Sequence, residues 1–169
     1  MKKGVKIFLI IILALIIILF FIRLINPREI DDVSPEIYCE QEFLEKADVL
    51  WIIPLYNNNP ISENKSWCKE ILSLNKTLGL HGVYHSPYRE FKYQEISKEY
   101  LEMGIKEFES CFEFSPEIFK APQLKINPKN ANLVKENNLK LRNDFHQITR
   151  KVYHCQDSGR VSNKIINIF

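Results

Sequence analysis

The stretch VLWIIP at residues 49–54 indicates the fold class of this chain. It is a continuous apolar run that Pro54 ends, as expected of a strand buried on both faces. Strands of this kind lie in parallel sheets whose faces are covered by helices. Candidate strands at 27–33, 80–84, 116–121, 139–141 and 151–153 alternate with helical patterns at 40–47, 67–78, 93–108 and 127–137. The sequence therefore predicts an α/β domain with a parallel sheet or barrel.

The composition excludes one class of function. The chain has 169 residues, 46% of them hydrophobic, and a formal net charge of +2. Residues 1–23 hold four basic residues and no acid, which leaves 19 basic and 21 acidic residues elsewhere. A folded part so nearly neutral lacks the basic surface that nucleic-acid binding needs. We therefore expect no nucleic-acid partner.

The amino terminus reads as a membrane segment. Residues 5–25 are apolar except for Lys6 and Arg23, which lie near the ends and can reach the headgroups. A cleaved secretory signal is the alternative, but no small-residue cleavage site follows the apolar run. The basic residues near Met1 outweigh Arg23 and Arg28, which predicts a cytoplasmic amino terminus. We expect a signal anchor at 1–25, a single-pass location in the cell membrane and an extracytoplasmic domain at 26–169.

All four cysteines, Cys39, Cys68, Cys111 and Cys155, lie in that outer part. An oxidising compartment permits disulfides, and four cysteines allow three pairings that the sequence does not separate. In a barrel, Cys111 would close a long helix on the face opposite the other three. We therefore expect Cys111 to be free.

Polar residues follow the candidate strands at the end where α/β folds place their chemistry. They are Asp31 and Asp32 after the first strand, His81 and His85 around the end of the third, Lys120 after the fourth and His154 after the last. Each has a plainer interpretation: an Asp pair is often turn chemistry, and a lone His is often a surface residue. Two histidines and a carboxylate are also the usual protein ligands of a catalytic zinc, which keeps one position open.

The motifs IDDVSP at 30–35, LHGVYH at 80–85 followed by Glu90, and FKAP at 119–122 resemble the polysaccharide deacetylase superfamily, in particular its branch of predicted bacterial and archaeal deacetylases. The resemblance covers about residues 28–169. It implies a distorted (β/α) barrel, here shortened, that removes acetyl groups from sugars with a divalent metal, which we expect to be Zn²⁺.

The resemblance also implies roles for single residues. Asp31 matches the general base, whereas Asp32, His81 and His85 match the metal ligands. His154 matches the general acid. Two residues would have supporting roles: Lys120 stands where an arginine is common, and Asp144 matches a late acidic position. Lysine cannot make the planar bidentate contact of arginine, so the sequence leaves open whether Lys120 positions Asp31. A backbone amide, that of Tyr84 or a neighbour, would stabilise the oxyanion.

Two hypotheses follow. The first is a membrane-anchored, metal-dependent deacetylase acting on an acetylated extracytoplasmic carbohydrate. The second is a catalytically inactive barrel that binds glycans or serves as a scaffold, or a truncated gene product, which the short chain favours. Because Asp31 lies eight residues after Arg23, we expect the amino-terminal ends of the strands near the headgroups and the metal site away from them. The sequence does not determine the oligomeric state.

Overall fold

The structure, a computed structural model, describes residues 3–86, 90–157 and 163–164. Six helices and six strands carry the fold. The helices are α1 (Lys3–Ile25), α2 (Gln41–Lys46), α3 (Lys65–Ser73), α4 (Lys98–Phe112), α5 (Pro128–Glu136) and α6 (Asp144–Thr149). The strands are β1 (Arg28–Val33), β2 (Val49–Ile52), β3 (Thr77–His81), β4 (Ile118–Lys120), β5 (Lys140–Arg142) and β6 (Lys151–His154).

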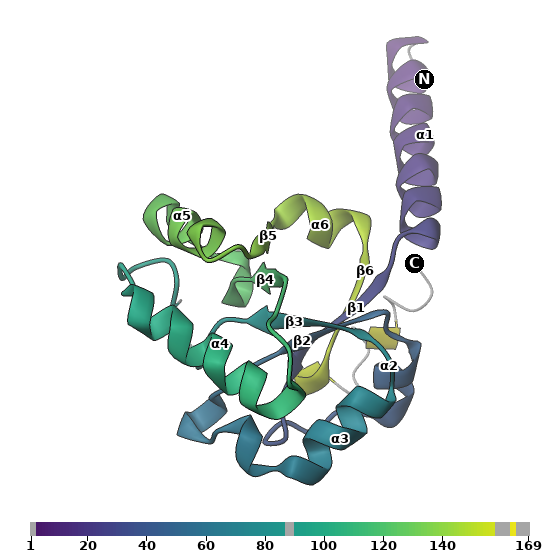
Figure 1. Ribbon diagram of the computed structural model, residues 1–169. Coiled ribbons are helices and arrows are strands. Elements are labelled where there is room, and N and C mark those ends of the chain that lie inside the picture. Colours follow the sequence, from purple (N-terminus) through teal and green to yellow (C-terminus); the bar gives the residue numbers. More distant parts are fainter. Residues whose placement is uncertain (1–2, 87–89, 158–162, 165–169) are drawn as a thin grey trace.

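The strands form one sheet in the order β5-β4-β3-β2-β1-β6, and every neighbouring pair is parallel. The sheet curls into an open half-barrel, with β5 and β6 at its two edges and α6 connecting them (Figure 1). This confirms the predicted α/β fold and its shortened barrel. A parallel sheet brings the carboxyl ends of all its strands to one edge, which is where the polar residues of the sequence collect.

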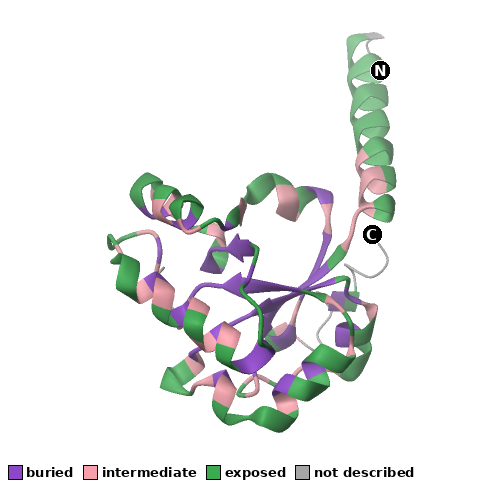
Figure 2. Ribbon diagram, in the orientation of Figure 1, coloured by how far each residue is buried: buried purple, intermediate pink, exposed green. Residues whose placement is uncertain are grey.

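The two faces of the sheet differ in what they contact. Leu50, Ile52, Leu80 and Phe119 point outward into the main core beneath the helices, whereas Trp51 points into the concave inner face with Val49 and Ile118. The sheet is accordingly the most continuously buried part of the fold (Figure 2). Gly79 faces the Trp51 ring so closely that a Cβ there would lie 2.5 Å from a ring carbon. The inner face is therefore filled by one large indole.

The third strand and the helix before it lie earlier in the chain than predicted. The helix predicted to continue to Leu78 ends at Ser73, and β3 spans Thr77–His81 instead of residues 80–84. Asn75 adopts a left-handed conformation (φ 53°), which stops the helix. Gly79, the residue directly after the predicted helix, lies inside β3. The helix predicted at 93–108 is α4, and it lies later in the chain, at Lys98–Phe112. It begins there because Ser97 caps it by accepting a hydrogen bond from the Tyr100 amide.

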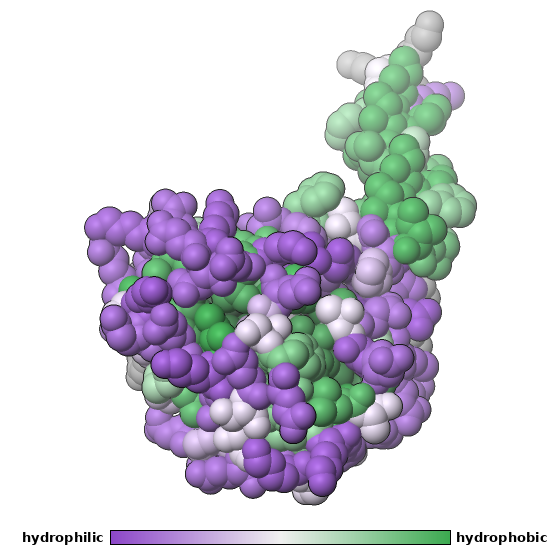
Figure 3. Space-filling model, viewed as in Figure 1, coloured by the Kyte–Doolittle hydropathy of each residue, from purple (hydrophilic) through white to green (hydrophobic). Residues whose placement is uncertain are grey.

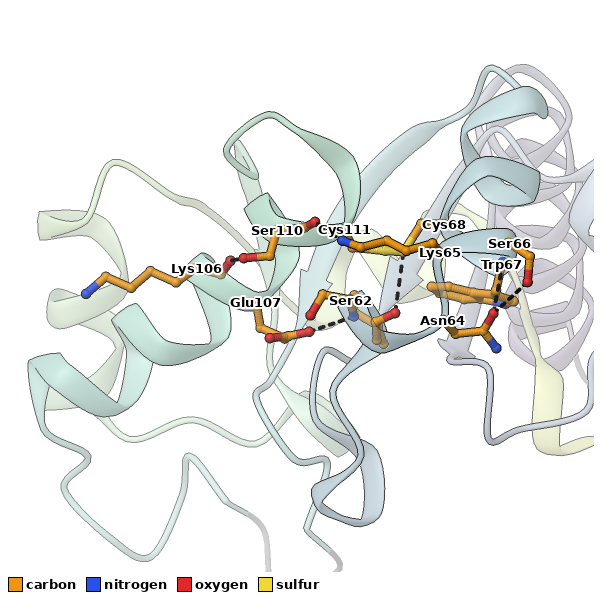
Figure 4. Close-up of a disulfide and its surroundings, with 11 residues drawn as sticks. Ser62, Asn64, Lys65, Ser66, Trp67, Cys68, Lys106, Glu107, Ser110 and Cys111 are labelled. Atoms are coloured by element: carbon orange, nitrogen blue, oxygen red, sulfur yellow. Dashed lines mark hydrogen bonds between the residues drawn. A yellow bond between two sulfur atoms is a disulfide. The ribbon is translucent and has the colours of Figure 1, made fainter.

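Two disulfides connect the four cysteines, Cys39–Cys155 and Cys68–Cys111. The expectation that Cys111 is free was wrong. The last turn of α4 packs on the start of α3, where the Lys65 ammonium donates to the Ser110 carbonyl at 2.9 Å and Cys111 lies 5.5 Å from Cys68, Cα to Cα (Figure 4). The way in which the two helices cross brings Cys68 and Cys111 together, and the sequence alone does not specify this crossing.

Helix α1 extends away from the domain as a separate rod (Figure 1). Within residues 4–25, a window of 18 residues has a mean hydropathy of 3.4, and none of that window is buried by the rest of the protein. Its apolar surface contrasts with the largely hydrophilic domain (Figure 3). By length and composition this helix could cross a membrane, and a signal sequence would have the same properties.

Candidate active site

An irregularity at the end of β1 turns two consecutive aspartates toward the same site. The pairing of β1 with β2 shifts register between Ile30 and Val33, and Asp32 has a φ of 64°. In a regular strand, neighbouring side chains point to opposite faces. The left-handed residue breaks this alternation, so Asp31 faces the concave side and Asp32 turns toward the loop after β3. Both carboxylates are buried.

Asp32 meets His81 and His85. The Nε2 atoms of His85 and His81 lie 3.0 and 3.5 Å from the same oxygen, Oδ1 of Asp32. The potential ligand atoms of the three residues all lie within 4.8 Å of one another. Nδ1 of His81 lies 3.0 Å from the Lys120 carbonyl oxygen. A carbonyl only accepts, so Nδ1 carries a proton and Nε2 is the nitrogen that faces Asp32.

Glu90 holds the loop that carries His85. Its carboxylate accepts hydrogen bonds from the amides of Val83 (2.9 Å), Tyr84 (3.3 Å) and Ser86 (3.3 Å) and from the Tyr100 hydroxyl (2.8 Å). This contact stabilises His85 in its left-handed conformation (φ 56°). The Tyr84 amide, which we expected to serve an oxyanion, therefore already donates to Glu90.

Asp31 lies between a lysine and a histidine. The Lys120 ammonium donates to both of its oxygens, at 2.7 and 2.8 Å, so Lys120 positions Asp31, a role that the sequence left open. A single Nζ has three protons and sits here between both oxygens, so a planar guanidinium is not required. Nε2 of His154 lies 3.5 Å from Oδ2 of Asp31. Strand pairing explains the histidine, since Asp31 pairs with His154, whereas Lys120 reaches Asp31 from β4 across the curl of the sheet.

Glu29 extends this buried network, and the sequence analysis missed it. Glu29 is 1% exposed and accepts a hydrogen bond from the Trp51 indole at 2.8 Å. It also pairs with Arg150 and lies 3.6 Å from the Lys120 ammonium. Side chains alternate between the two faces of a strand, so Glu29 shares the inner face with Asp31. This alternation was the signal in the sequence that could have identified Glu29 as part of the site. An acid on that face has to be paired, because an unpaired buried charge is strongly unfavourable.

The site opens into a cavity of about 360 Å³ lined by Asp31, Asp32, His81, His85, Lys120 and His154, together with Gln123, Gln147 and Gln156. A larger cavity of about 630 Å³ adjoins it, since His85, Gln123 and Gln156 line both. Asp144 is exposed in the first turn of α6 and does not line either cavity. The structure thus brings six of the seven candidate residues together and leaves Asp144 outside.

The surroundings shift two pKa values in opposite directions. Burial raises the pKa of Asp32, but its hydrogen bonds to His81 and His85 and their charges outweigh burial, and that pKa lies well below its usual value. Burial lowers the pKa of His85, but the hydrogen bond and charge of Asp32 outweigh burial and raise it. Both shifts show that the anionic carboxylate is the form this pair of histidines favours.

The donor set of Asp32, His81 and His85 fits a divalent metal. Two imidazole nitrogens and one carboxylate oxygen converge from β1 and from β3 with the loop that follows it, and the backbone contact of His81 orients its ring as a ligand. Two histidines and one carboxylate are a common ligand set of catalytic zinc. Asp31 is held by Lys120, so the two adjacent aspartates have separate partners.

Comparison of the sequence with models of known families and with curated proteins finds no match. Comparison of the structure does find relatives, and they share the fold of the CE4 (polysaccharide deacetylase) family. One is a CE4 family pseudoenzyme from Bacillus anthracis, 12% identical, with a TM-score of 0.53 over 71% of this chain and 49% of that chain. Another is the CE4 domain of a multidomain xylanase from the hindgut metagenome of Trinervitermes trinervoides, 13% identical, with a TM-score of 0.52 over 85% of this chain and 83% of that chain.

A mutant of the pseudoenzyme, described as having restored enzymatic activity, is 11% identical with a TM-score of 0.52. The chain spans about half the length of the pseudoenzyme. The resemblance stated from the motifs is thus supported by the fold, which the chain shares with both a CE4 domain of a xylanase and a CE4 family pseudoenzyme.

Proposed function

We propose that this protein is a membrane-anchored, metal-dependent deacetylase of an acetylated extracytoplasmic carbohydrate. One observation carries the proposal: Asp32, His81 and His85 converge at 3.0–3.5 Å, and Asp31 and His154 line the same cavity. A structural role for these residues would not require five ionisable side chains around one cavity. Perturbed, clustered titratable groups of this kind are typical of functional sites.

The residues divide the chemistry of acetyl hydrolysis between them. Asp32, His81 and His85 would hold the metal. A bound Zn²⁺ lowers the pKa of water toward about 7 and polarises a carbonyl. Asp31, fixed by Lys120 on the inner face, accepts the proton of the attacking water. His154 donates a proton to the departing nitrogen or oxygen of the sugar, and its side chain is the most accessible of the group at 35% exposure.

The larger cavity supports a carbohydrate as the substrate. Three tyrosines, Tyr56, Tyr84 and Tyr100, and four amide side chains, those of Asn57, Asn58, Gln123 and Gln156, line it beside His85. Aromatic faces pack on the apolar faces of sugar rings, and amides pair with hydroxyls in either direction. Such a lining suits a neutral, hydroxyl-rich ligand. The choice of bond, N-acetyl or O-acetyl, is left to experiment.

The disulfides and α1 support the location. Both disulfides need an oxidising compartment, which lies outside the cytoplasm. The end of α1 contacts the domain: the Arg23 guanidinium donates to the Ile148 carbonyl at 2.9 Å, and the Asn26 amide donates to the Thr149 carbonyl at 3.1 Å. Contacts of this kind favour an uncleaved anchor over a signal that is removed.

The test uses the full chain purified in detergent, with metal content and acetate release measured on the same samples. We expect about one Zn²⁺ per chain in the wild type. Asp31→Asn should keep the metal and lose acetate release from N-acetylated and O-acetylated oligosaccharides, whereas Asp32→Asn should lose both. Asp48→Asn is the matched control, because Asp48 is an exposed acid at the far end of the sheet from the site. A wild-type protein that binds no metal would refute the proposal.

A catalytically silent barrel that binds glycans is the second candidate. The fold that the chain shares with a CE4 family pseudoenzyme favours it. Under this alternative the protein binds oligosaccharides in the larger cavity, and Tyr56→Ala weakens that binding, while no preparation with Zn²⁺ releases acetate.

A further inference from the structure

Helix α6 presents two large apolar side chains to solvent beside the end of α1. Phe145 is 69% exposed and Ile148 is 57% exposed. Three residues apart on a helix, they share one side, and Gln147 on the other side lines the candidate catalytic cavity. The contacts of Arg23 and Asn26 with the last turn of α6 place this apolar pair next to the point where α1 ends (Figure 1).

Cationic side chains surround the same junction. Arg23 ends α1, Arg28 begins β1 and pairs in register with Lys151 of β6, and Arg142 and Arg150 flank α6. Lys151 is only 5% exposed and Arg150 pairs with Glu29, so we call the other three, Arg23, Arg28 and Arg142, the cationic collar. The proximity of Arg23 to Arg28 is visible in Lys151, whose pKa is lowered by burial and by the charges of both arginines.

Few carboxylates balance the collar. Glu29 pairs with Arg150 inside the sheet, and Asp48 accepts from the Arg28 amide at 2.8 Å. Arg142 Nη1 lies within hydrogen-bond distance of a histidine and not of an acid in the described part of the chain, with Nε2 of His146 at 3.1 Å. The collar therefore carries more positive charge than these acids neutralise. It lies at the end of α1, a helix long enough to cross a bilayer.

We propose that α6 is a membrane-docking element, with Phe145 and Ile148 inserted at the headgroup level and the cationic collar on anionic phosphates. The inference rests on the anchoring part of the proposed function and not on its catalysis. An exposed apolar pair next to cations is the pattern of elements that lie in a bilayer interface. Anionic headgroups attract each nearby Lys or Arg, and a transmembrane anchor keeps the collar within reach of them.

The docking would fix the height of the catalytic cavity. Because α6 contacts the bilayer with one side and lines the cavity with the other, only the thickness of one helix, about 10 Å, separates the two. A domain tethered by α1 alone would swivel about residues 26–27. With α6 as a second contact, the cavity would be presented to carbohydrate at a constant distance from the membrane.

The experiment measures quenching of tryptophan by brominated lipid in nanodiscs that hold the full chain. Phe145→Trp and Ile148→Trp introduce reporters on the docking side, and either one alone tests the proposal if the other fails to fold. Tyr38→Trp is the matched control: Tyr38 is 79% exposed but follows the carboxyl end of β1, far from the α1 junction. The native Trp51 and Trp67 supply a constant background.

With anionic lipid we expect brominated acyl chains to remove about half of the emission added at 145 or 148, since interfacial side chains lie roughly 5–10 Å deep. Emission added at 38 should not change. Arg142→Gln should reduce quenching at 145 in anionic discs to the level seen in zwitterionic discs. Equal quenching at 145 and 38 in discs that retain the chain would overturn the docking while the anchor stands. A chain that does not stay in the disc would overturn the anchor as well. Neither result bears on the catalytic part of the proposed function, which acetate release tests separately.

Discussion

Lys120→Met removes the buried cation on which the site's electrostatics depend. Lys120 is 1% exposed, contacts both oxygens of Asp31, lies 3.6 Å from Glu29 and sits 5.6 Å above the Trp51 ring. Methionine has nearly the same length, so the change leaves no large cavity. Glu29 keeps Trp51 and Arg150, whereas among the described residues Asp31 keeps only His154, at 3.5 Å, as a charged partner.

The magnitude follows from this loss of pairing. Breaking a buried ion pair by removing one partner destabilises a protein by about 3–5 kcal/mol, because the remaining charge is left without compensation. The cation–π contact with Trp51 adds about 0.5–1 kcal/mol at most, since the ring is already packed on Gly79. We expect the free energy of unfolding to fall by roughly 3.5–6 kcal/mol in total.

Urea denaturation of the full chain in detergent, followed by near-ultraviolet circular dichroism, measures this change. Lys125→Met is the matched control: Lys125 is an exposed lysine five residues later, and the same substitution there should change stability by less than about 0.5 kcal/mol. In the Asp31→Asn background, Lys120→Met should be milder by about 1.5–3 kcal/mol, since a neutral amide does not need the ammonium. Equal effects of Lys120→Met with and without Asp31, or equal effects at 120 and 125, would refute the pairing argument.

Three further predictions test the site and the scaffold. His154→Ala should slow acetate release by about 10²–10⁴-fold with metal content unchanged, and wild-type rates in that variant would remove His154 from the acid role. Gly79→Ala should destabilise the domain by about 1–3 kcal/mol, since its Cβ would lie 2.5 Å from the Trp51 ring, and calorimetry would detect the lowered Tm. Replacing Cys68 and Cys111 together by serine should cost about 2–4 kcal/mol by urea denaturation. Free-thiol labelling of the wild type at Cys111 would contradict the disulfide itself.

Much of the fold follows from local patterns in the chain. The run at residues 49–53 is apolar on both faces because both faces of β2 are covered, and this predicted a parallel sheet before any strand order was known. Asn127 followed by Pro128 marked the start of α5 correctly, because capping depends on two neighbouring residues. The presence of each strand likewise followed from a local pattern of residues. The boundaries of α3 and β3 depended instead on one left-handed residue, Asn75.

Part of the candidate site could be predicted from the sequence because of the topology of a parallel sheet. Residues that follow parallel strands meet at one edge of the sheet, so Asp31, His81, Lys120 and His154 could be placed together from their positions in the sequence. Alternation along β1 would have turned Asp32 away from Asp31, and only the register shift and the left-handed backbone bring both carboxylates to the cavity. That Lys120 contacts both oxygens of Asp31 depends on the distance between β1 and β4 across the curl of the sheet.

Contacts between elements distant in the sequence were decided by tertiary structure alone. The pairing of Cys68 with Cys111 depends on how α4 crosses α3, and helix crossing depends on the packing of both surfaces at once. The position of Phe145 and Ile148 beside Arg23 depends on the sheet order, which places β6 next to β1 and so brings α6 to the end of α1. A one-dimensional pattern specifies which face of an element is apolar, but the partner of that face is determined only when the whole chain has packed.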